Sequence, residues 1–173
     1  GVCIERYLDD KIKDIEAGSG GLILQPFWTP GITNPNASGA IIGFSDFHTR
    51  YHLYRAIIEG ICLELYHGLV KMQKRSSVTV DELYAGGGGS SSPVVCQIAA
   101  DVFGLPVHRI QTHEASAVGC AMVAFISQGV YGSYEDAIEH MVHKKDVFIP
   151  NEENHRTYMK IYGKVYSHLA SRL

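Results

Sequence analysis

Residues 82–103 read ELYA, then GGGGSSSP, then VVCQIAADVF, and this order of segments decides the fold. The first segment predicts a short strand that the glycines end. The last segment carries apolar residues at helical spacing and predicts a helix. Ser92 is a suitable N-cap for that helix, and Pro93 suits its first position, where a missing amide has no intrahelical partner to lose. The sequence therefore predicts a strand, a glycine turn and a helix in that order.

The glycine turn at residues 86–92 is suited to holding a phosphate group. Glycine has no side chain, so a ligand can approach its main chain closely. Backbone amides from about Val94 onward lie at the positive end of the helix dipole, where an anion is stabilised. A flexible turn that only connects strand and helix stays open as the alternative at this point.

Two common nucleotide-binding motifs do not match this turn. A dinucleotide fingerprint that starts at Gly86 or Gly87 would need glycine at Ser91 or Ser92. A P-loop ends in Gly-Lys followed by serine or threonine, and the turn contains no lysine. Any phosphate bound here is therefore expected to contact main-chain amides.

The remaining sequence alternates between predicted strands and helices. Residues 4–16 predict an amphipathic helix, followed by a flexible joint at residues 18–21, and residues 49–75 predict a buried central helix. Prolines and glycines in residues 25–39, such as Pro30, Gly31 and Pro35, predict a long packed loop. The other predicted strands cover 22–24, 40–44 and 107–110, and the other predicted helices cover 114–128, 134–142 and 154–169. This alternation predicts an α/β domain with right-handed crossover connections.

Composition narrows the class of protein. The chain has 173 residues, of which 46% are hydrophobic, and a formal net charge of -3. These values favour one globular domain and give no cationic field for nucleic acid or an anionic membrane. The cysteines Cys3, Cys62, Cys96 and Cys120 form no Cys-x-x-Cys pair. We therefore expect reduced thiols, no zinc site and a cytoplasmic location.

Three segments in order resemble the FGGY carbohydrate kinases. Residues 39–44 read GAIIGF and, after a seven-residue gap, residues 52–59 read HLYRAIIE, as in a family signature, with Phe44 in place of the usual aliphatic residue. Residues 87–93, followed by Gln97, resemble the family's Gly-Gly-Gly-x-x-Ser-Pro segment. Residues 114–121 resemble its later Glu-x-x-x-x-Gly-Ala-Ala helix.

This resemblance implies an α/β fold of the actin and hexokinase type. It predicts an RNase H-like domain, with a mixed sheet and flanking helices, that closes with an N-terminal domain over ATP and a sugar or polyol. Residues 1–173 then form a single domain, most of the C-terminal kinase domain, and the N-terminal domain is absent. Residues 1–21 supply a helix and joint, 22–150 the nucleotide-binding core, and 151–173 the closing helix.

The resemblance also implies a function and a set of site residues. It predicts an ATP-dependent carbohydrate kinase that uses Mg²⁺, with nucleotide phosphates contacted by Gly87, Gly88, Gly89 and Ser92. The family's catalytic aspartate has no match here, so we expect the base upstream of Gly1 and no phosphate transfer by this segment alone. The expected partners are ATP, a small sugar or polyol and the N-terminal domain, and a homo-oligomer is compatible with the sequence.

A second hypothesis is a noncatalytic or degenerate module that keeps the kinase fold as a nucleotide-binding or regulatory domain. The two hypotheses differ in the residues upstream of Gly1. An aspartate followed by a Thr/Gly-rich phosphate loop favours the enzyme, and their absence favours the module.

Several polar residues have ordinary structural explanations beside functional ones. Asp46 could serve as a base, but capping of the helix near Thr49 explains it better. His48 and His52 could ligate a metal from one helical face, but a solvated or packed pair is favoured because a third ligand is lacking. Arg55 and Glu59, four residues apart, predict a weak helix ion pair.

Aromatic and small residues lead to further expectations. Tyr158, Tyr162 and Tyr166 recur every four residues and predict a helix packed on its domain with the hydroxyl groups toward water. Gly119 lies in a run of small residues and predicts close approach of a neighbouring element. Trp28 could reach an interdomain cleft or pack in the core, and both interpretations stay open.

Overall fold

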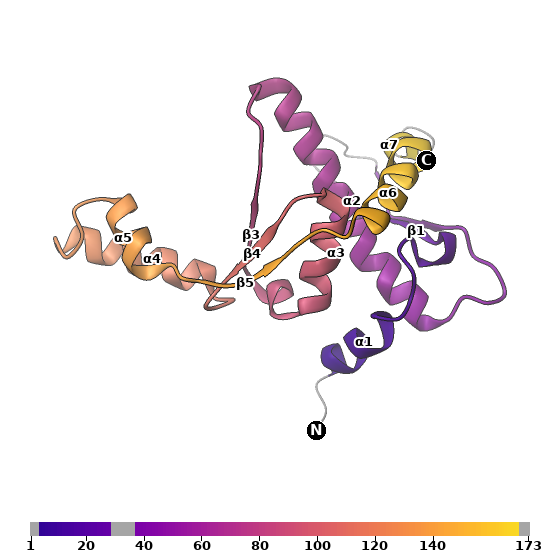
Figure 1. Cartoon of the computed structure of the whole chain (residues 1–173), viewed down its shortest axis with the longest axis horizontal. Coiled ribbons are helices and arrows are strands. Elements are labelled where there is room, and N and C mark those ends of the chain that lie inside the picture. Colours follow the sequence, from indigo (N-terminus) through magenta and orange to yellow (C-terminus); the bar gives the residue numbers. More distant parts are fainter. Residues whose placement is uncertain (1–3, 29–36, 170–173) are drawn as a thin grey trace.

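The computed structural model of the chain describes residues 4–28 and 37–169. Most of the predicted long loop, with Pro30, Gly31 and Pro35, lies outside the described residues, as do Cys3 and positions 170–173. Figure 1 shows helices packed around two small sheets, with one pair of helices extending away from the body as an arm.

The first sheet is a short antiparallel pair that crosses the long helix α2. Strand β1 (Ile23–Gln25) pairs with β2 (Ala40–Ile42), and the chain then enters α2 (Arg50–Ser76). The crossing is very close, since a Cβ atom at Gly60 of α2 would lie 2.4 Å from the Leu24 carbonyl oxygen. Gly43 follows β2 with φ +93°, and its Cβ would lie 2.2 Å from the Gly21 carbonyl oxygen. A side chain at Gly60 would push β1 off α2, and one at Gly43 would push the end of β2 away from the Gly21 backbone.

The second sheet is mixed, as the sequence predicts. Strand β3 (Leu83–Ala85) runs parallel to β4 (Val107–Ile110), and α3 (Pro93–Phe103) forms the crossover between them. Strand β5 (Lys144–Phe148) pairs antiparallel with β4. Strand β5 is not predicted from the sequence, because it begins with two lysines and its residues show no clear alternation of apolar and polar types.

The main core lies between α2, α3 and the C-terminal helices. These are α6 (Glu152–Ile161), a π-helical turn, η3 (Tyr162–Tyr166), and α7 (Ser167–Leu169). They replace the single closing helix expected from residue 154 onward. Buried core residues come from segments far apart in the sequence, and they are Ile12, Ile58, Cys62, Leu63, Ile98, Val102, Tyr158 and Tyr166. Burial of this apolar surface provides the main driving force for the fold.

The central helix is less buried than its pattern predicts. Its buried residues all lie between Arg55 and Leu63, in the N-terminal half. Further along, Leu65 is 61% and Met72 49% exposed, and Figure 1 shows this end of α2 extending above the body. The expectation of a buried central helix therefore holds for the N-terminal half and is wrong for the C-terminal half.

The joint after the first helix is fixed by hydrogen bonds, which corrects the expectation of flexibility. Helix α1 (Ile4–Ile12) is followed by a short turn, η1 (Ser19–Gly21), in which Ser19 is fully buried. The Gly18 amide donates to Glu59 Oε1 at 3.1 Å, and the Ser19 hydroxyl donates to Glu59 Oε2 at 2.7 Å. The glycines supply left-handed backbone conformations, and the contacts with Glu59 remove the freedom that the sequence suggests.

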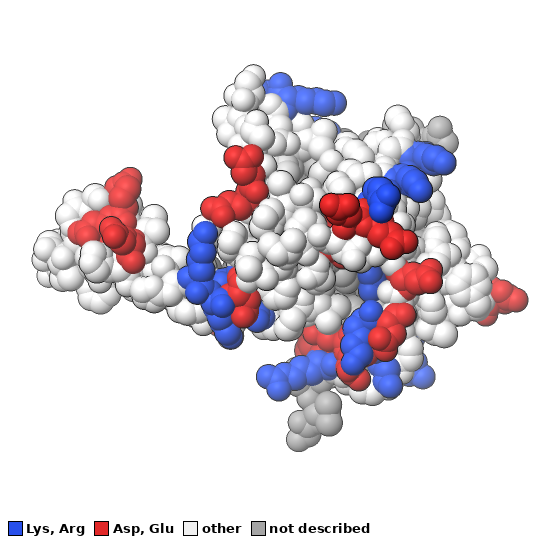
Figure 2. All heavy atoms as spheres, in the orientation of Figure 1, with Lys and Arg blue, Asp and Glu red and all other residues white. Residues whose placement is uncertain are grey.

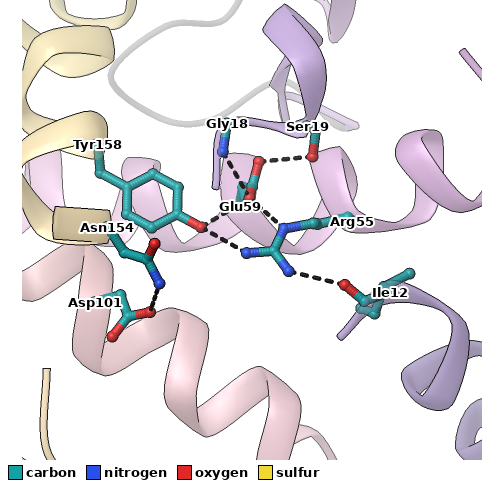
Figure 3. A network of polar contacts seen from close by, with 8 residues as sticks. All are labelled: Ile12, Gly18, Ser19, Arg55, Glu59, Asp101, Asn154 and Tyr158. Carbon is teal, nitrogen blue, oxygen red and sulfur yellow. Dashed lines mark hydrogen bonds and ion pairs between the residues drawn. The ribbon is translucent and has the colours of Figure 1, made fainter. Parts of the chain in front are cut away.

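Arg55 and Glu59 form the centre of a buried polar network, shown in Figure 3. The Arg55 Nε donates to Glu59 Oε1 at 2.8 Å, and both residues are at most 5% exposed. Arg55 Nη1 also donates to the Ile12 carbonyl oxygen at 2.9 Å. The expected helix ion pair is present, but it lies under α1, the joint and α6 and joins all three to α2, so the expectation of a weak, local pair is wrong.

The tyrosines of the closing segment point their hydroxyl groups inward, contrary to the expectation. The Tyr158 hydroxyl donates to Glu59 Oε1 at 2.7 Å and belongs to the network in Figure 3. The Tyr166 hydroxyl donates to the Gly60 carbonyl oxygen at 3.2 Å, and Tyr162 bonds with His67 Nδ1 at 2.8 Å. Burial raises the pKa of both Tyr158 and Tyr166, so both stay neutral donors.

A second polar network joins the start of α6 to α3. Asp101 is 2% exposed and accepts a hydrogen bond from Gln97 Nε2 at 2.8 Å within α3. It also accepts from the Asn151 amide and from Asn154 Nδ2, each at 2.8 Å. These bonds satisfy the buried carboxylate and hold the N-terminus of α6 on α3.

The arm in Figure 1 consists of α4 (Ala115–Ser127) and α5 (Tyr134–Met141). In α4 only Met122 is buried, and a Cβ at Gly119 would meet no atom within 4 Å. The expected close neighbour of Gly119 is therefore not found among the described residues. None of the described helices has both the length and the hydropathy needed to cross a bilayer.

The Glu59 network leads to a prediction about stability. Changing Glu59 to Gln leaves the Arg55 guanidinium buried without its counter-charge, so we expect the free energy of unfolding to fall by about 3 to 5 kcal/mol. Chemical denaturation followed by circular dichroism measures this change.

The control is Asp10→Asn, which breaks an exposed ion pair with Lys13. We expect it to leave the unfolding midpoint near that of the unmodified protein, because exposed pairs contribute little. The double variant Arg55→Met with Glu59→Leu should be more stable than Glu59→Gln. Equal stability of Glu59→Gln and the unmodified protein would contradict a central role for this network.

The cysteines lead to a second prediction. Burial raises the pKa of the Cys62 thiol to about 12, and burial also raises the pKa of Cys96. Both thiols stay protonated and unreactive at pH 8, whereas Cys120 is exposed. Iodoacetamide at pH 8 should label Cys120 and spare Cys62 and Cys96 until denaturant is added, as peptide mapping by mass spectrometry will show. Labelling of Cys62 at the rate of Cys120 in the native protein would contradict this packing.

Candidate functional site

A cleft of about 1030 Å³ lies between α1 and the glycine turn. On one side it is lined by Asp9 and Asp10 of α1 and by Lys13 directly after this helix, and on the other by the start of α3 and the turn before it. Side chains of both charge signs reach it, and Figure 2 shows basic and acidic groups mixed over α1 and the adjacent surface. Acidic and basic residues therefore line the cleft in similar numbers.

The glycine turn forms one wall of this cleft. Gly88, Gly89 and Ser92 line it, and Gly88 to Ser91 form a short 3-10 helix, η2. A Cβ placed on Gly87, Gly88 or Gly89 would meet no atom within 4 Å. The space in front of the main chain is thus open, as the sequence predicts.

The five carbonyl groups from Gly87 to Ser91 are engaged by donors of the protein. The Gly87 oxygen accepts from the Ser90 hydroxyl at 2.7 Å, and the Gly88 oxygen accepts from the Ser91 hydroxyl at 2.7 Å. Main-chain and side-chain donors engage the next three carbonyl oxygens, which are those of Gly89, Ser90 and Ser91. The negative ends of these peptide dipoles therefore have partners within the protein.

Main-chain amides at the starts of η2 and α3 have no hydrogen-bond partner within their own helices. The Ser92 Oγ accepts from the Val95 amide at 3.1 Å, which confirms Ser92 as the N-cap of α3. Gly88 and Gly89 open η2, and Val94 is in the first turn of α3, so none of their amides has a partner within its own helix. Together they place hydrogen-bond donors and the positive end of a helix dipole at the cleft.

Gly87 shapes the turn and does not line the cleft. Its amide donates to the His113 carbonyl oxygen at 2.8 Å, and its φ of 82° with ψ of 177° is open only to glycine. Of the three glycines expected to contact phosphates, Gly88 and Gly89 line the cleft, and Gly87 is not among its lining residues.

Arg109 of β4 also lines the cleft, and no motif in the sequence points to it. Its guanidinium donates to the carbonyl oxygens of Ser90 and Ser91. The only sequence signal is a charged residue inside a short strand, between His108 and Ile110. That signal does not indicate which loop the side chain reaches, because the contact spans 18 and 19 residues of chain.

The other candidates from the sequence lie away from the cleft. Thr49 itself caps α2, paired with His52, so the expectation that Asp46 caps this helix is wrong. His48 and His52 pack together with ring centroids 5.5 Å apart, as the packed-pair interpretation predicts. Trp28 is 62% exposed and is not packed in the core.

Comparison with known proteins identifies the family. A model of the C-terminal domain of the FGGY family of carbohydrate kinases matches residues 19–128, which include the first sheet, α2, the glycine turn and α4. The chain belongs to this family.

Similar FGGY proteins include named sugar kinases. An uncharacterised sugar kinase of Escherichia coli is 32% identical over 154 residues, which is 89% of this chain and 31% of that protein. A xylulose kinase of Staphylococcus epidermidis is 32% identical over 150 residues, which is 84% of this chain and 30% of that protein. The chain thus spans about one third of the length of these relatives.

Solved structures of FGGY kinases share the fold. The crystal structure of xylulose kinase from Rhodospirillum rubrum has a TM-score of 0.80 and 29% identity, over 96% of this chain and 34% of that one. The mixed α/β architecture expected from the sequence, of the actin and hexokinase type, is thereby confirmed.

The FGGY glycine turn leads to a third prediction. Gly87→Ala should lower the free energy of unfolding by about 1 to 3 kcal/mol, because alanine is strained at that φ and ψ. Gly88→Ala should change it by no more than about 0.5 kcal/mol, since a Cβ there meets open space. Thermal and chemical denaturation of both variants tests this contrast. Equal effects of the two substitutions would contradict the turn geometry.

Proposed function

We propose that this domain binds the phosphates of ATP for a kinase that phosphorylates a hydroxyl group of a small sugar or polyol. The observation that carries the proposal is the glycine turn, in which the carbonyl oxygens from Gly87 to Ser91 are engaged by the protein while amides of Gly88, Gly89 and Val94 lack helical partners at a cleft. Membership of a carbohydrate kinase family supports the same assignment.

The proposed role of the residues is positioning. Gly88 and Gly89 let the phosphates approach the main chain, and Ser92 keeps the α3 N-terminus in place beside them. Gly87 sets the direction of the turn. Phosphoryl transfer depends chiefly on alignment and on stabilisation of charge, so a rigid set of amides is a suitable contribution from one domain.

Magnesium belongs to the proposal as a companion of ATP. Among the described residues we find no group of three or more His, Cys, Asp or Glu side chains that could hold a metal ion. Carboxylates of Asp9 and Asp10 reach the cleft, and Mg²⁺ commonly takes one or two carboxylates together with substrate phosphates and water. When bound, the ion would neutralise charge on the phosphates.

The remaining functions are assigned outside the chain. In this proposal the general base and most of the acceptor site belong to residues beyond 1–173, in a domain that closes over the cleft. The relatives that we compared are about three times as long, which leaves room for such a domain in proteins of this family.

The fourth prediction tests nucleotide binding. In the complete gene product that contains this sequence, Gly88→Val should raise the dissociation constant of ATP by about 10-fold or more, because the side chain occupies the phosphate position and removes charge-assisted hydrogen bonds. Isothermal titration calorimetry with ATP and Mg²⁺ measures the constant.

The matched control is Gly68→Val on α2, which is also a glycine whose Cβ meets open space but which does not line the cleft. We expect its dissociation constant for ATP to equal that of the unmodified protein. If ATP binds equally well to Gly88→Val, the glycine turn is not the phosphate site. If the unmodified protein phosphorylates no member of a panel of sugars and polyols yet binds ATP, the noncatalytic module is the better description.

A further inference from the structure

Arg109 joins the sheet to the glycine turn. It lies on β4, and its Nη1 donates to the carbonyl oxygen of Ser90 at 3.2 Å and to that of Ser91 at 3.2 Å. These are the last two carbonyl groups before the α3 cap, Ser92. One side chain therefore holds the end of the turn at the point where it enters the helix.

Arg109 is in turn held by β5. Its Nε donates to Asp146 Oδ2 at 2.8 Å, and its Nη2 donates to the same oxygen. Arg109 and Asp146 are direct partners in the β4–β5 ladder, and the guanidinium lies 5.5 Å from the centre of the Phe148 ring. The Arg109 side chain is 14% exposed, so its position is fixed by contacts on several sides.

We propose that Arg109 is a positioning residue for the phosphate-binding turn and that Asp146 orients it. This inference rests on the proposed function, because it concerns the same turn. Neither residue is required to contact the nucleotide. Their role is to keep the Ser90 and Ser91 carbonyl groups turned away from the phosphates.

The physical reason is the direction of two peptide dipoles. The serine hydroxyl groups hold the carbonyls of Gly87 and Gly88, but those of Ser90 and Ser91 depend on Arg109, with a longer contact from Cys96 Sγ to Ser90 at 3.6 Å. Ser90 and Ser91 belong to the short 3-10 helix η2, in which hydrogen-bond geometry is poorer than in an α-helix, so these peptide groups are weakly held by the turn itself. Without the guanidinium, a carbonyl oxygen could rotate toward the cleft and place negative partial charge where the phosphates bind.

The test compares variants of the complete gene product by calorimetry with ATP and Mg²⁺. Arg109→Met should raise the dissociation constant by about 10-fold, the effect of losing bonds from one charged donor. The number of sites per molecule should stay at the value of the unmodified protein. A role in folding alone would lower the number of sites and leave the dissociation constant of the folded fraction unchanged.

Two further variants keep the test decisive if Arg109→Met does not fold. Asp146→Asn retains a hydrogen-bond acceptor for Arg109 but removes the charge, and it should raise the dissociation constant by a smaller factor than Arg109→Met. Arg109→Lys retains a positively charged hydrogen-bond donor but lacks the planar guanidinium. It should raise the dissociation constant by a smaller factor than Arg109→Met. The matched control is Lys144→Met, because Lys144 lies on β5, the strand of Asp146, but contacts Glu82 and Tyr84.

The outcomes separate this inference from the proposed function. An unchanged dissociation constant in Arg109→Met or Asp146→Asn, beside a raised one in Gly88→Val, would overturn the inference and leave the proposed function standing. An equal rise in Lys144→Met would also overturn it, because the effect would then be general to β5. Absence of ATP binding by the unmodified protein would overturn both.

Discussion

The carboxylate of Glu59 lies where the N-terminal segment, the central helix and the closing helix meet, and the arrangement of the domain depends on its partners. It accepts hydrogen bonds from Arg55, Tyr158, Gly18 and Ser19, which come from three separate parts of the chain. A buried carboxylate is costly unless such donors surround it. The elements that supply the donors are therefore held in one relative position, and α1 is brought to the side of the cleft opposite the glycine turn.

Residues of the family signature, which covers 39–44 and 52–59, have structural roles in the Glu59 network and in the packing of the first sheet. Glu59 closes the signature, and Gly60 directly after it lets β1 cross α2 at very short range. Gly43, at the other end, adopts a left-handed conformation against the backbone of Gly21. These residues contribute no group to the cleft. They fix how the first sheet crosses α2, and α2 in turn supports α3 through the core.

The cleft combines a part that is local in sequence with a part that is not. Ser92, Pro93 and the glycines make a capped helix start with open space before its main chain, and this part follows from capping and backbone preferences. The orientation of the carbonyl groups depends also on Arg109, which the parallel pairing of β3 and β4 brings beside the turn. A rigid wall thus arises from two strands and a helix that meet at one edge of the sheet.

By itself the sequence determined the order of strand, turn and helix, the N-cap at Ser92 and the family, because these depend on neighbouring residues and on spacing along the chain. Tertiary structure alone decided that Arg55 and Glu59 are buried, that the hydroxyl groups of Tyr158 and Tyr166 point inward, and that Arg109 reaches the turn. Helical spacing shows which residues share a face, but it does not show what covers that face. Polar residues on a covered face find partners that are distant in sequence, and only the folded chain brings those partners together.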